Sequence, residues 1–372
     1  MLLDVLLIIA IGLALVHFGF PLAYYYYLKK KWLGKPWDIK REPEYNPRVS
    51  IIIPTYNEAG LIEDKLDDLA RQDYPRDLLE VIVVDSASID GTLGKVEEWA
   101  WKNTGVKLVL LREPVRRGMV PALNYALKHI PEDAEIVVFT DTDSFWDKNT
   151  LKTITEYFAD SSVGALTASI EPLETGKVDR ETNYRGFYNV VRVSESKKHS
   201  TPIHNGGLIA YRKALLDKIG GFPLYTGNND STPASLIAFM GYRAIQVDDA
   251  VVKEPILKNR LRRKIRRAQH LILHFIHTKQ YAKKIGIYKK STFDKIWLIE
   301  SYLHLANPWL LIISAGILLA NTILLHIQSI ILLSIGIAML FAKAYRTWIE
   351  TQLCLVIGSI RNLWTKEIAW EK

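Results

Sequence analysis

The sequence contains a single cysteine, Cys354, among 372 residues. One cysteine excludes an intramolecular disulfide, and it also excludes a zinc site built from several cysteines. The chain has no HExxH pair, no GxGxxG and no GxxxxGK(S/T). A zinc protease, a standard dinucleotide-binding fold and a P-loop are therefore not indicated. There is no internal repeat and no low-complexity tract, so we expect a domain of ordinary size with appendages.

The sequence also has fewer acidic than basic residues. Lys and Arg total 48 against 40 Asp and Glu, which gives a net charge of +8. A basic chain suits a nucleic acid, an anionic membrane surface or a phosphorylated ligand. The arginines lack the interleaved aromatic residues of a nucleic-acid surface, so nucleic acid is not expected as a partner. A membrane and a phosphorylated ligand remain.

Long apolar runs stand at both ends of the chain. Residues Leu2 to Leu28 are long enough to cross a hydrocarbon core, which is about 30 Å thick. Lys29 to Lys31 follow this run, and lysines mark the cytoplasmic side of a span. The bulky residues at its end favour a retained anchor over a cleaved signal peptide. We therefore predict a transmembrane anchor over residues 1–31 and a linker over 32–47.

Two more apolar runs, Leu303 to Leu325 and Ser329 to Tyr345, predict a transmembrane hairpin over residues 301–346. Lys343 and Arg346 place the ends of this hairpin in the cytoplasm, on the same side as the lysines after the first run. The alternative for each run is a buried core helix. We expect a multi-pass protein of the cell membrane with its catalytic domain in the cytoplasm.

Residues 48–255 alternate strand-like and helix-like patterns. Continuous apolar strands separated by helices are typical of a Rossmann-like, mostly parallel sheet that is covered on both faces. In such sheets ligands bind just beyond the carboxyl ends of the strands. Glu58, Asp85 and Asp141 fall at those ends. The sequence therefore predicts an α/β domain with a ligand site at this edge.

Asp141 and Asp143 follow the fourth apolar run, in the stretch FTDTDS. Two carboxylates one residue apart repel each other unless a cation lies between them. A hard divalent ion takes one or two carboxylates and fills its other positions with water and phosphate oxygens. The pair therefore predicts a Mg²⁺ or Mn²⁺ site that binds a diphosphate. An exposed turn is the alternative explanation for such a pair when it stands alone.

Four stretches in this order resemble family 2 glycosyltransferases of the GT-A fold: SIIIPTYNEAGLIEDKLDDLARQDYP, EVIVVDSASIDGT, RRGMVPALNYAL and FTDTDS. The resemblance covers residues 48 to about 270 and implies a GT-A domain over 48–255. A nucleotide-sugar half would occupy 48–150 and an acceptor half 151–255. Asp141 and Asp143 would hold the metal and the diphosphate of a nucleoside-diphosphate-sugar. The residues expected to line the nucleotide pocket are Pro54, Tyr56, Glu58, Asp85 and Gly118.

The sequence departs from the family pattern at two positions. Ser86 follows Asp85 where the family often has a second aspartate, and Met119 follows Gly118 where it often has lysine. The residues therefore leave the nucleotide and the sugar open.

The acceptor half holds a candidate catalytic base. Family 2 enzymes have a Glu-Asp pair whose aspartate is the base, and the similar position here is Asn229-Asp230. A sugar hydroxyl needs a base within hydrogen-bond reach. The alternative is that Asp230 caps the helix that begins at Ser231. Gly206 and Gly207 would let a substrate approach the backbone closely.

Residues 256–300 carry a basic amphipathic pattern, which is typical of helices that lie on an anionic membrane surface. Alternatively Arg263, Arg266 or Arg267 turns inward and clamps the diphosphate. The family's Gln-x-x-Arg-Trp region is missing here, which speaks against a processive polysaccharide synthase. A further apolar stripe predicts an interfacial C-terminal helix over 347–372.

These observations together predict a membrane-bound, inverting glycosyltransferase. It would move one sugar from a nucleoside-diphosphate-sugar to an acceptor hydroxyl on a lipid-linked saccharide or glycolipid. A polyprenyl-phosphate (dolichyl-phosphate) sugar synthase is the alternative within the class, because its phosphate acceptor is already ionised and needs little help from a base. An inactive membrane scaffold is less favoured, since Asp141, Asp143 and Asp230 are all present.

Overall fold

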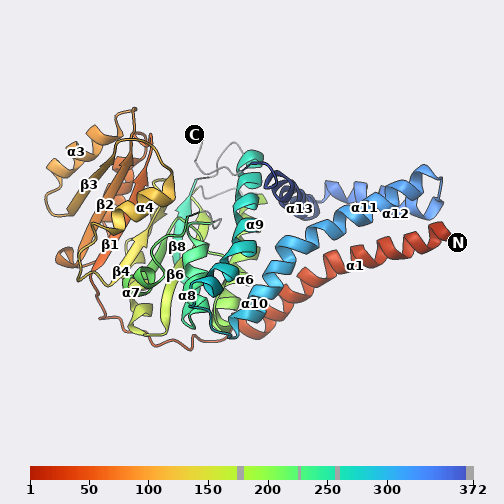
Figure 1. Ribbon diagram of the computed structural model, residues 1–372, viewed down its shortest axis with the longest axis horizontal. Helices are drawn as coiled ribbons and strands as arrows, with labels where there is room; N and C mark the ends of the chain where they lie inside the picture. Colours follow the sequence, from red (N-terminus) through yellow and green to blue (C-terminus); the bar gives the residue numbers. More distant parts are fainter. Residues whose placement is uncertain (174–179, 225–227, 256–259, 366–372) are drawn as a thin grey trace.

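The computed structural model describes residues 1–173, 180–224, 228–255 and 260–365, and Figure 1 shows their arrangement. Eight strands of these residues form one sheet in the order β3-β2-β1-β4-β7-β6-β8-β5. The first strand begins at Val49 and the last ends at Glu254. The predicted internal boundaries of the domain remain predictions.

The first half of the sheet is parallel. Its strands are β1 (Val49–Thr55), β2 (Leu79–Ser86), β3 (Lys107–Glu113) and β4 (Ile136–Phe139). The helices that connect them are α2 (Ile62–Ala70), α3 (Thr92–Lys102) and α4 (Met119–Leu127). Ile51 packs in one core with Leu66 of α2, whereas its neighbour Ile52 packs in another core with Leu123 of α4. Both faces of the sheet are covered, which confirms the predicted α/β fold.

The second half of the sheet is mixed. Its strands are β5 (Phe145–Trp146), β6 (Val163–Pro172), β7 (Ile209–Arg212) and β8 (Arg243–Glu254). Its helices are α5 (Thr150–Glu156), α6 (Arg180–Lys198), α7 (Lys213–Lys218) and α8 (Ser231–Phe239). Strand β7 runs antiparallel to β4, so Ile209 at its start pairs with Phe139 at the end of β4. This reversal places Gly206 beside Asp141 and Gly207 beside Ser144, both in the loop that follows β4.

Two apolar helices leave the sheet side by side and reach the N-terminal tip of the molecule (Figure 1). Helix α1 (Leu2–Leu28) continues as a π-helical segment to Leu33. Helix α10 (Phe293–Ser301) continues through a π-helical segment into α11 (Asn307–Ile323). Leu2–Leu33 and Phe293–Ile323 are long and apolar enough to cross a membrane.

The third predicted span, over 329–345, is not a straight helix. Helix α12 (Ile327–Ala338) is followed by a short 3₁₀ turn, and α13 (Lys343–Arg361) begins at an angle of 106° to it. The apolar run ends at Phe341, and Ala342 is extended, so the chain turns where its charged residues begin. The two helices could form one broken span. Of the predicted C-terminal helix, residues 366–372 lie outside the described part.

Helix α9 (Arg260–Lys284) lies within residues 256–300, where the sequence predicts interfacial helices, and that assignment stays a prediction. Ala268 and Ile272 pack with Cys354 of α13, and Phe275 packs with Trp297 of α10. The part of α9 that holds these residues is therefore covered by protein, while Leu261 and Ile276 of the same helix are exposed. Residues 256–259 lie outside the described part.

Candidate active site

The turns after β1 and β2 are joined by hydrogen bonds. The Asn57 side chain accepts a hydrogen bond from the Ile89 amide at 3.0 Å, and the Asn57 amide donates to Ser88 Oγ at 2.9 Å. The Glu58 amide donates to Thr92 Oγ1 at 2.8 Å. The predicted nucleotide-pocket residues on these two turns therefore occupy one stretch of the sheet edge.

Asp85 ends β2 with a buried carboxylate, which accepts a hydrogen bond from the Ser88 amide at 3.0 Å. Its strand neighbour in β1 is Thr55, directly after Pro54. The next residue, Ser86, donates to the buried carboxylate of Glu113 at the end of β3, at 2.7 Å. In place of a second aspartate, this chain thus has a hydroxyl that joins two strands.

An arginine that the sequence reading left unassigned covers Tyr56. The Arg116 guanidinium carbon lies 3.9 Å from the centre of the Tyr56 ring, a cation–π arrangement. Gly118 follows in the same loop with φ of 104°, a conformation that favours glycine. Helix α4 begins at the next residue. The pair Arg116-Arg117 before Gly118 is the feature of the sequence that could have indicated this arginine.

Asp141 and Asp143 follow β4, as predicted. The Asp141 amide donates to the Gly206 carbonyl at 3.1 Å, which joins this loop to the turn before β7. Burial raises the pKa of Asp141 well above its usual range, and the charges of Asp143, Glu254 and Asp230 raise it further, while Arg267 opposes them. Negative charge therefore exceeds positive charge around Asp141.

This excess of carboxylates fits a divalent cation. Within the described residues, no cluster of three His, Cys, Asp or Glu side chains has the geometry of a metal site. The Asp141 and Asp143 carboxylates are the protein ligands that we predict for the ion. Mg²⁺ and Mn²⁺ accept such an arrangement when water and substrate phosphates complete the shell.

Gly206 and Gly207, the two glycines predicted to contact a substrate, are closely packed against polar groups of the protein. A Cβ at Gly206 would lie 3.1 Å from Asp141 Oδ2, and one at Gly207 would lie 2.8 Å from Glu254 Oε1 and 3.0 Å from Ser144 Oγ. The space that a side chain would need is filled by these polar groups. Glu254, at the end of β8, is a second residue that the sequence reading missed.

Asp230 caps α8, as the alternative interpretation predicts. Its Oδ1 accepts hydrogen bonds from the amide and the hydroxyl of Ser231, whereas Oδ2 takes part in neither bond. Burial raises the pKa of this carboxyl, although the bonds from Ser231 lower it. Next to it, Asn229 Nδ2 donates to Met119 Sδ, so the acceptor half touches the start of α4.

The three arginines of α9 differ in their placement. Arg263 and Arg267 are exposed and Arg266 is half-buried. Arg267 is close enough to Asp141 for its charge to lower the pKa of that carboxyl. The structure therefore supports a position of Arg267 near the predicted diphosphate.

Comparison with known proteins agrees with this geometry. The family model "Glycosyl transferase family 2" matches residues 50–220. The chain is 26% identical to the glycosyltransferase AglE of Haloferax volcanii over 178 residues. This match covers 48% of this chain and 56% of that protein. The chain is 40% identical to the poly(ribitol-phosphate) beta-N-acetylglucosaminyltransferase TarS of Staphylococcus aureus over 105 residues, 28% of this chain and 18% of that protein. The chain thus spans only part of these relatives.

The chain is also similar to a solved structure over the full length of that structure. That structure is the mannosyltransferase PcManGT from Pyrobaculum calidifontis in complex with GDP-Man and Mn²⁺, with 46% identity and a TM-score of 0.88. The similarity covers 97% of this chain and 100% of that one. A nucleotide-sugar donor and a divalent metal cofactor follow for the present enzyme. The chain belongs to glycosyl transferase family 2.

Proposed function

We propose that this protein is a membrane-associated, inverting mannosyltransferase that moves mannose from GDP-mannose to a hydroxyl of a lipid-linked saccharide or glycolipid. The observation that carries the proposal is the placement of Asp141, Asp143 and Asp230 within electrostatic range at one edge of the sheet. The choice of GDP-mannose is supported by the full-length similarity to a mannosyltransferase whose solved complex contains GDP-Man and Mn²⁺.

The donor side uses residues from the first half of the sheet. Asp141 and Asp143 would hold a divalent ion, which would neutralise the charge that develops on the leaving diphosphate. Arg267 adds a positive charge near the same place. The Tyr56 ring, with Arg116 against it, offers a flat surface for a nucleobase, and stacking on an aromatic ring is worth about 1–3 kcal/mol per base.

On the acceptor side, Asp230 takes the proton of the attacking hydroxyl. Its raised pKa makes it a stronger base than an exposed aspartate. Transfer would then proceed by a single displacement, in which the acceptor oxygen attacks the anomeric carbon as the diphosphate leaves. A single displacement inverts the anomeric centre of the sugar.

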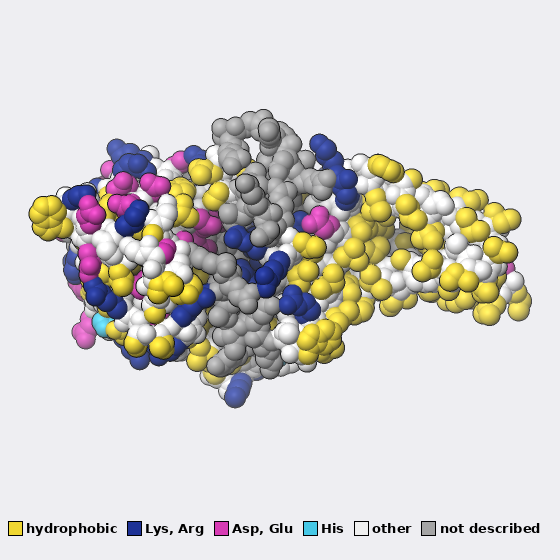
Figure 2. Space-filling view, turned by 90° about the horizontal axis from the view of Figure 1, so that it is seen from above, with side chains coloured by type: hydrophobic (Ala, Val, Ile, Leu, Met, Phe, Trp, Pro, Cys, Tyr) yellow, Lys and Arg dark blue, Asp and Glu magenta, His cyan; other side chains and the backbone are white. Residues whose placement is uncertain are grey.

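A membrane-held acceptor is supported by the apolar arm. Figure 2 shows hydrophobic side chains over the arm that contains α1, α11 and α12. Large apolar residues such as Ile8, Leu15 and Ile323 are 69%, 67% and 73% exposed. An apolar surface this extensive marks a membrane or partner interface. The catalytic domain would then lie at the cytoplasmic surface of the membrane.

The experiment is a donor screen on the full-length protein in lipid. We expect turnover of GDP-mannose with Mn²⁺ to exceed that of UDP- and dTDP-sugars, and we expect EDTA to abolish it. Asp143→Ala should abolish it as well. Asp133→Ala, an exposed carboxylate before the start of β4, is the control and should leave it unchanged. Full activity in EDTA, or preference for another nucleotide, would overturn the proposal.

A further inference from the structure

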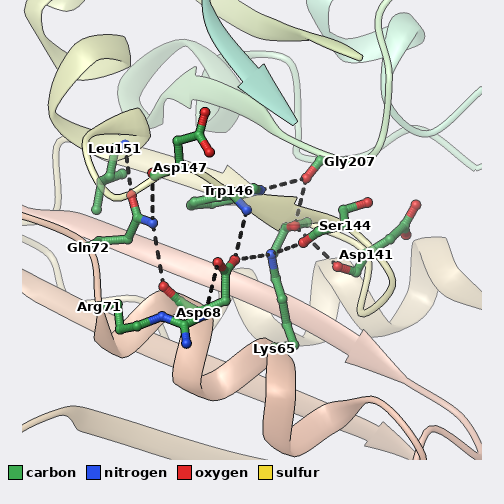
Figure 3. A network of polar contacts seen from close by, with 11 residues as sticks. Lys65, Asp68, Arg71, Gln72, Asp141, Ser144, Trp146, Asp147, Leu151 and Gly207 are labelled. Carbon is green, nitrogen blue, oxygen red and sulfur yellow. Dashed lines mark hydrogen bonds and ion pairs between the residues drawn. The ribbon is translucent and has the colours of Figure 1, made fainter. Parts of the chain in front are cut away.

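A lysine of α2 is fully buried beneath the loop that carries the two metal-binding aspartates. The Lys65 side chain has 0% exposure. Its Nζ donates to the Ser144 carbonyl at 2.5 Å and lies 3.5 Å from Asp68 Oδ2 (Figure 3). It also lies 4.3 Å from the centre of the Trp146 ring. The Lys65 ammonium group therefore connects α2 to residues 144–146.

Burying an ammonium group is expensive, and the stability of the fold does not require it. Removing a charge from water costs several kcal/mol, and well-packed apolar residues often stabilise a core as well as a buried ion pair does. Burial lowers the pKa of Lys65 to about 8, whereas the charges of Asp68, Asp141 and Asp143 raise it. Lys65 is thus within electrostatic range of both metal-binding carboxylates.

The same network connects α2 to both sides of the metal site. Asp68 accepts a hydrogen bond from the Trp146 amide at 3.0 Å, and the Trp146 indole donates to the Gly207 carbonyl at 3.1 Å. Thr140 Oγ1 donates to that carbonyl too, at 2.7 Å. Figure 3 shows these contacts as one chain running from the helix to the glycine turn.

We infer that Lys65 is a positioning residue of the metal site, whose buried ammonium group holds the loop that carries Asp141 and Asp143. The inference rests on the proposed function, because it assigns a role within the same site. Ser144 directly follows Asp143, so a bond to its carbonyl fixes the backbone from which the Asp143 carboxylate extends. The positive charge also offsets the repulsion between the two carboxylates.

A helix residue that merely filled space could be replaced without effect on metal binding. Misplacing a reacting group by about 1 Å can cost a hundredfold in rate. We therefore expect loss of the cation to weaken metal and donor binding, and to leave turnover largely intact once both are saturating.

The experiment measures Mn²⁺ binding to the full-length protein in the presence of GDP, from the electron paramagnetic resonance signal of free Mn²⁺. The test variant is Lys65→Met with Asp68→Asn, which removes the buried pair without leaving a lone charge and keeps an acceptor for the Trp146 amide. We expect this variant to need at least about tenfold more Mn²⁺. Its KM for the donor should rise while kcat at saturating Mn²⁺ stays within a few-fold.

Two further variants separate positioning from stability. Asp68→Asn alone keeps the cation under the loop and should bind Mn²⁺ like the wild type. Gln72→Leu removes bonds from the turn after α2 to Asp147 and Leu151, farther along the chain from the aspartates. It should lower thermal stability without changing Mn²⁺ binding.

The outcomes are distinct. Wild-type Mn²⁺ affinity in the double variant would overturn the inference. So would a weakening of Mn²⁺ binding by about tenfold in Asp68→Asn alone, which is measured against the wild type and stands even if the double variant does not fold. Absence of GDP-dependent Mn²⁺ binding in the wild type would overturn the proposed function instead.

Discussion

At the scale of single residues, the Asp230 carboxylate caps α8 and is also the proposed catalytic base. Asn can still accept the bond from the Ser231 amide, but it cannot take a proton. We therefore predict that Asp230→Asn keeps the fold and donor binding while transfer to a hydroxyl falls by at least about a hundredfold. Transfer rates and donor titration calorimetry measure the two effects. Near-normal transfer would favour the polyprenyl-phosphate acceptor instead.

The pH dependence of transfer follows from the same carboxyl. Asp230 acts as a base only when ionised, and burial raises its pKa above the ordinary 3.8 of an aspartate. The rate of transfer should therefore be maximal above that raised pKa, and it should be lost as the pH falls through it. A profile of kcat against pH at saturating metal should show an acid limb displaced upward from 3.8. A wild-type profile whose acid limb lay at or below pH 3.8 would contradict this prediction.

Gly207 tests the close packing of the acidic cluster. A Cβ there would lie 2.8 Å from Glu254 Oε1 and 2.9 Å from Val252 Cγ1, and overpacking of this kind costs about 1–3 kcal/mol. We predict that Gly207→Ala lowers the thermal midpoint and donor turnover together. The control is Gly94→Ala in α3, where a Cβ meets nothing within 4 Å. Equal behaviour of the two variants would contradict the packing argument.

Sequence reasoning found the acidic residues and missed the groups that act on them. Asp141 and Asp143 stand in one short motif, so their proximity is local. Glu254 comes from a strand more than a hundred positions later, and only the order of the sheet brings it to Gly207. Lys65 stands in the stretch IEDKLDD, which has the composition of a solvated helix face. Its burial depends on where the loop after β4 passes.

At the scale of elements, α9 shows why periodicity does not distinguish a lipid-facing helix from a protein-facing one. Both environments select the same apolar stripe. The cover over Ala268 and Phe275 comes from α13 and α10, which the periodicity of α9 does not indicate. The strands of the first half were predictable because continuous apolar runs have few other solutions than a sheet buried on both faces.

His274 on α9 makes the packing of α8 and α9 sensitive to acid. Its Nε2 donates to the Pro202 carbonyl at 3.1 Å, and Nδ1 accepts from the hydroxyls of Thr232 and Thr278. Burial lowers its pKa from 6.5 to about 3, so the folded protein holds it neutral. The unfolded chain binds a proton below 6.5, and the free energy of unfolding therefore falls as the pH drops from 6.5 towards 3.

We predict that this histidine alone costs about 2 kcal/mol of stability between pH 7 and pH 5. His274→Gln cannot titrate, so its thermal midpoint should change less over this interval than that of the wild type. At pH 7 the variant should be the less stable protein, because its contacts are poorer. A midpoint that fell just as steeply in the variant would remove His274 as a source of acid sensitivity.

At the scale of the whole molecule, polar groups fix how the apolar helices pair. Trp348 Nε1 donates to His17 Nε2 at 3.0 Å, so the proton of the ring is on Nδ1, which donates to the Asn307 carbonyl at 2.9 Å. These three residues come from α1, α11 and α13. The apolar runs were visible in the sequence, but their pairing was not, because single polar residues inside such runs carry no partner information.

The arrangement also gives the topology prediction its physical basis. Lys29 to Lys31 lie at the end of α1 that meets the catalytic domain, and α13, which begins at Lys343, packs against α9 of that domain. Met1 lies at the far tip of the arm (Figure 1). Since positive residues stay in the cytoplasm, we predict a cytoplasmic catalytic domain and an N-terminus outside.

Protease added to sealed, right-side-out vesicles tests this orientation. A tag before Met1 should be cleaved, while the fragment containing residues 48–255 should stay intact until detergent opens the vesicles. Cleavage within 48–255 in sealed vesicles, with a cytoplasmic marker protein still protected, would mean that the lysines do not set the orientation. The catalytic edge would then face the outside, where nucleotide sugars are not supplied from the cytoplasm, and the proposed donor would have to change with it.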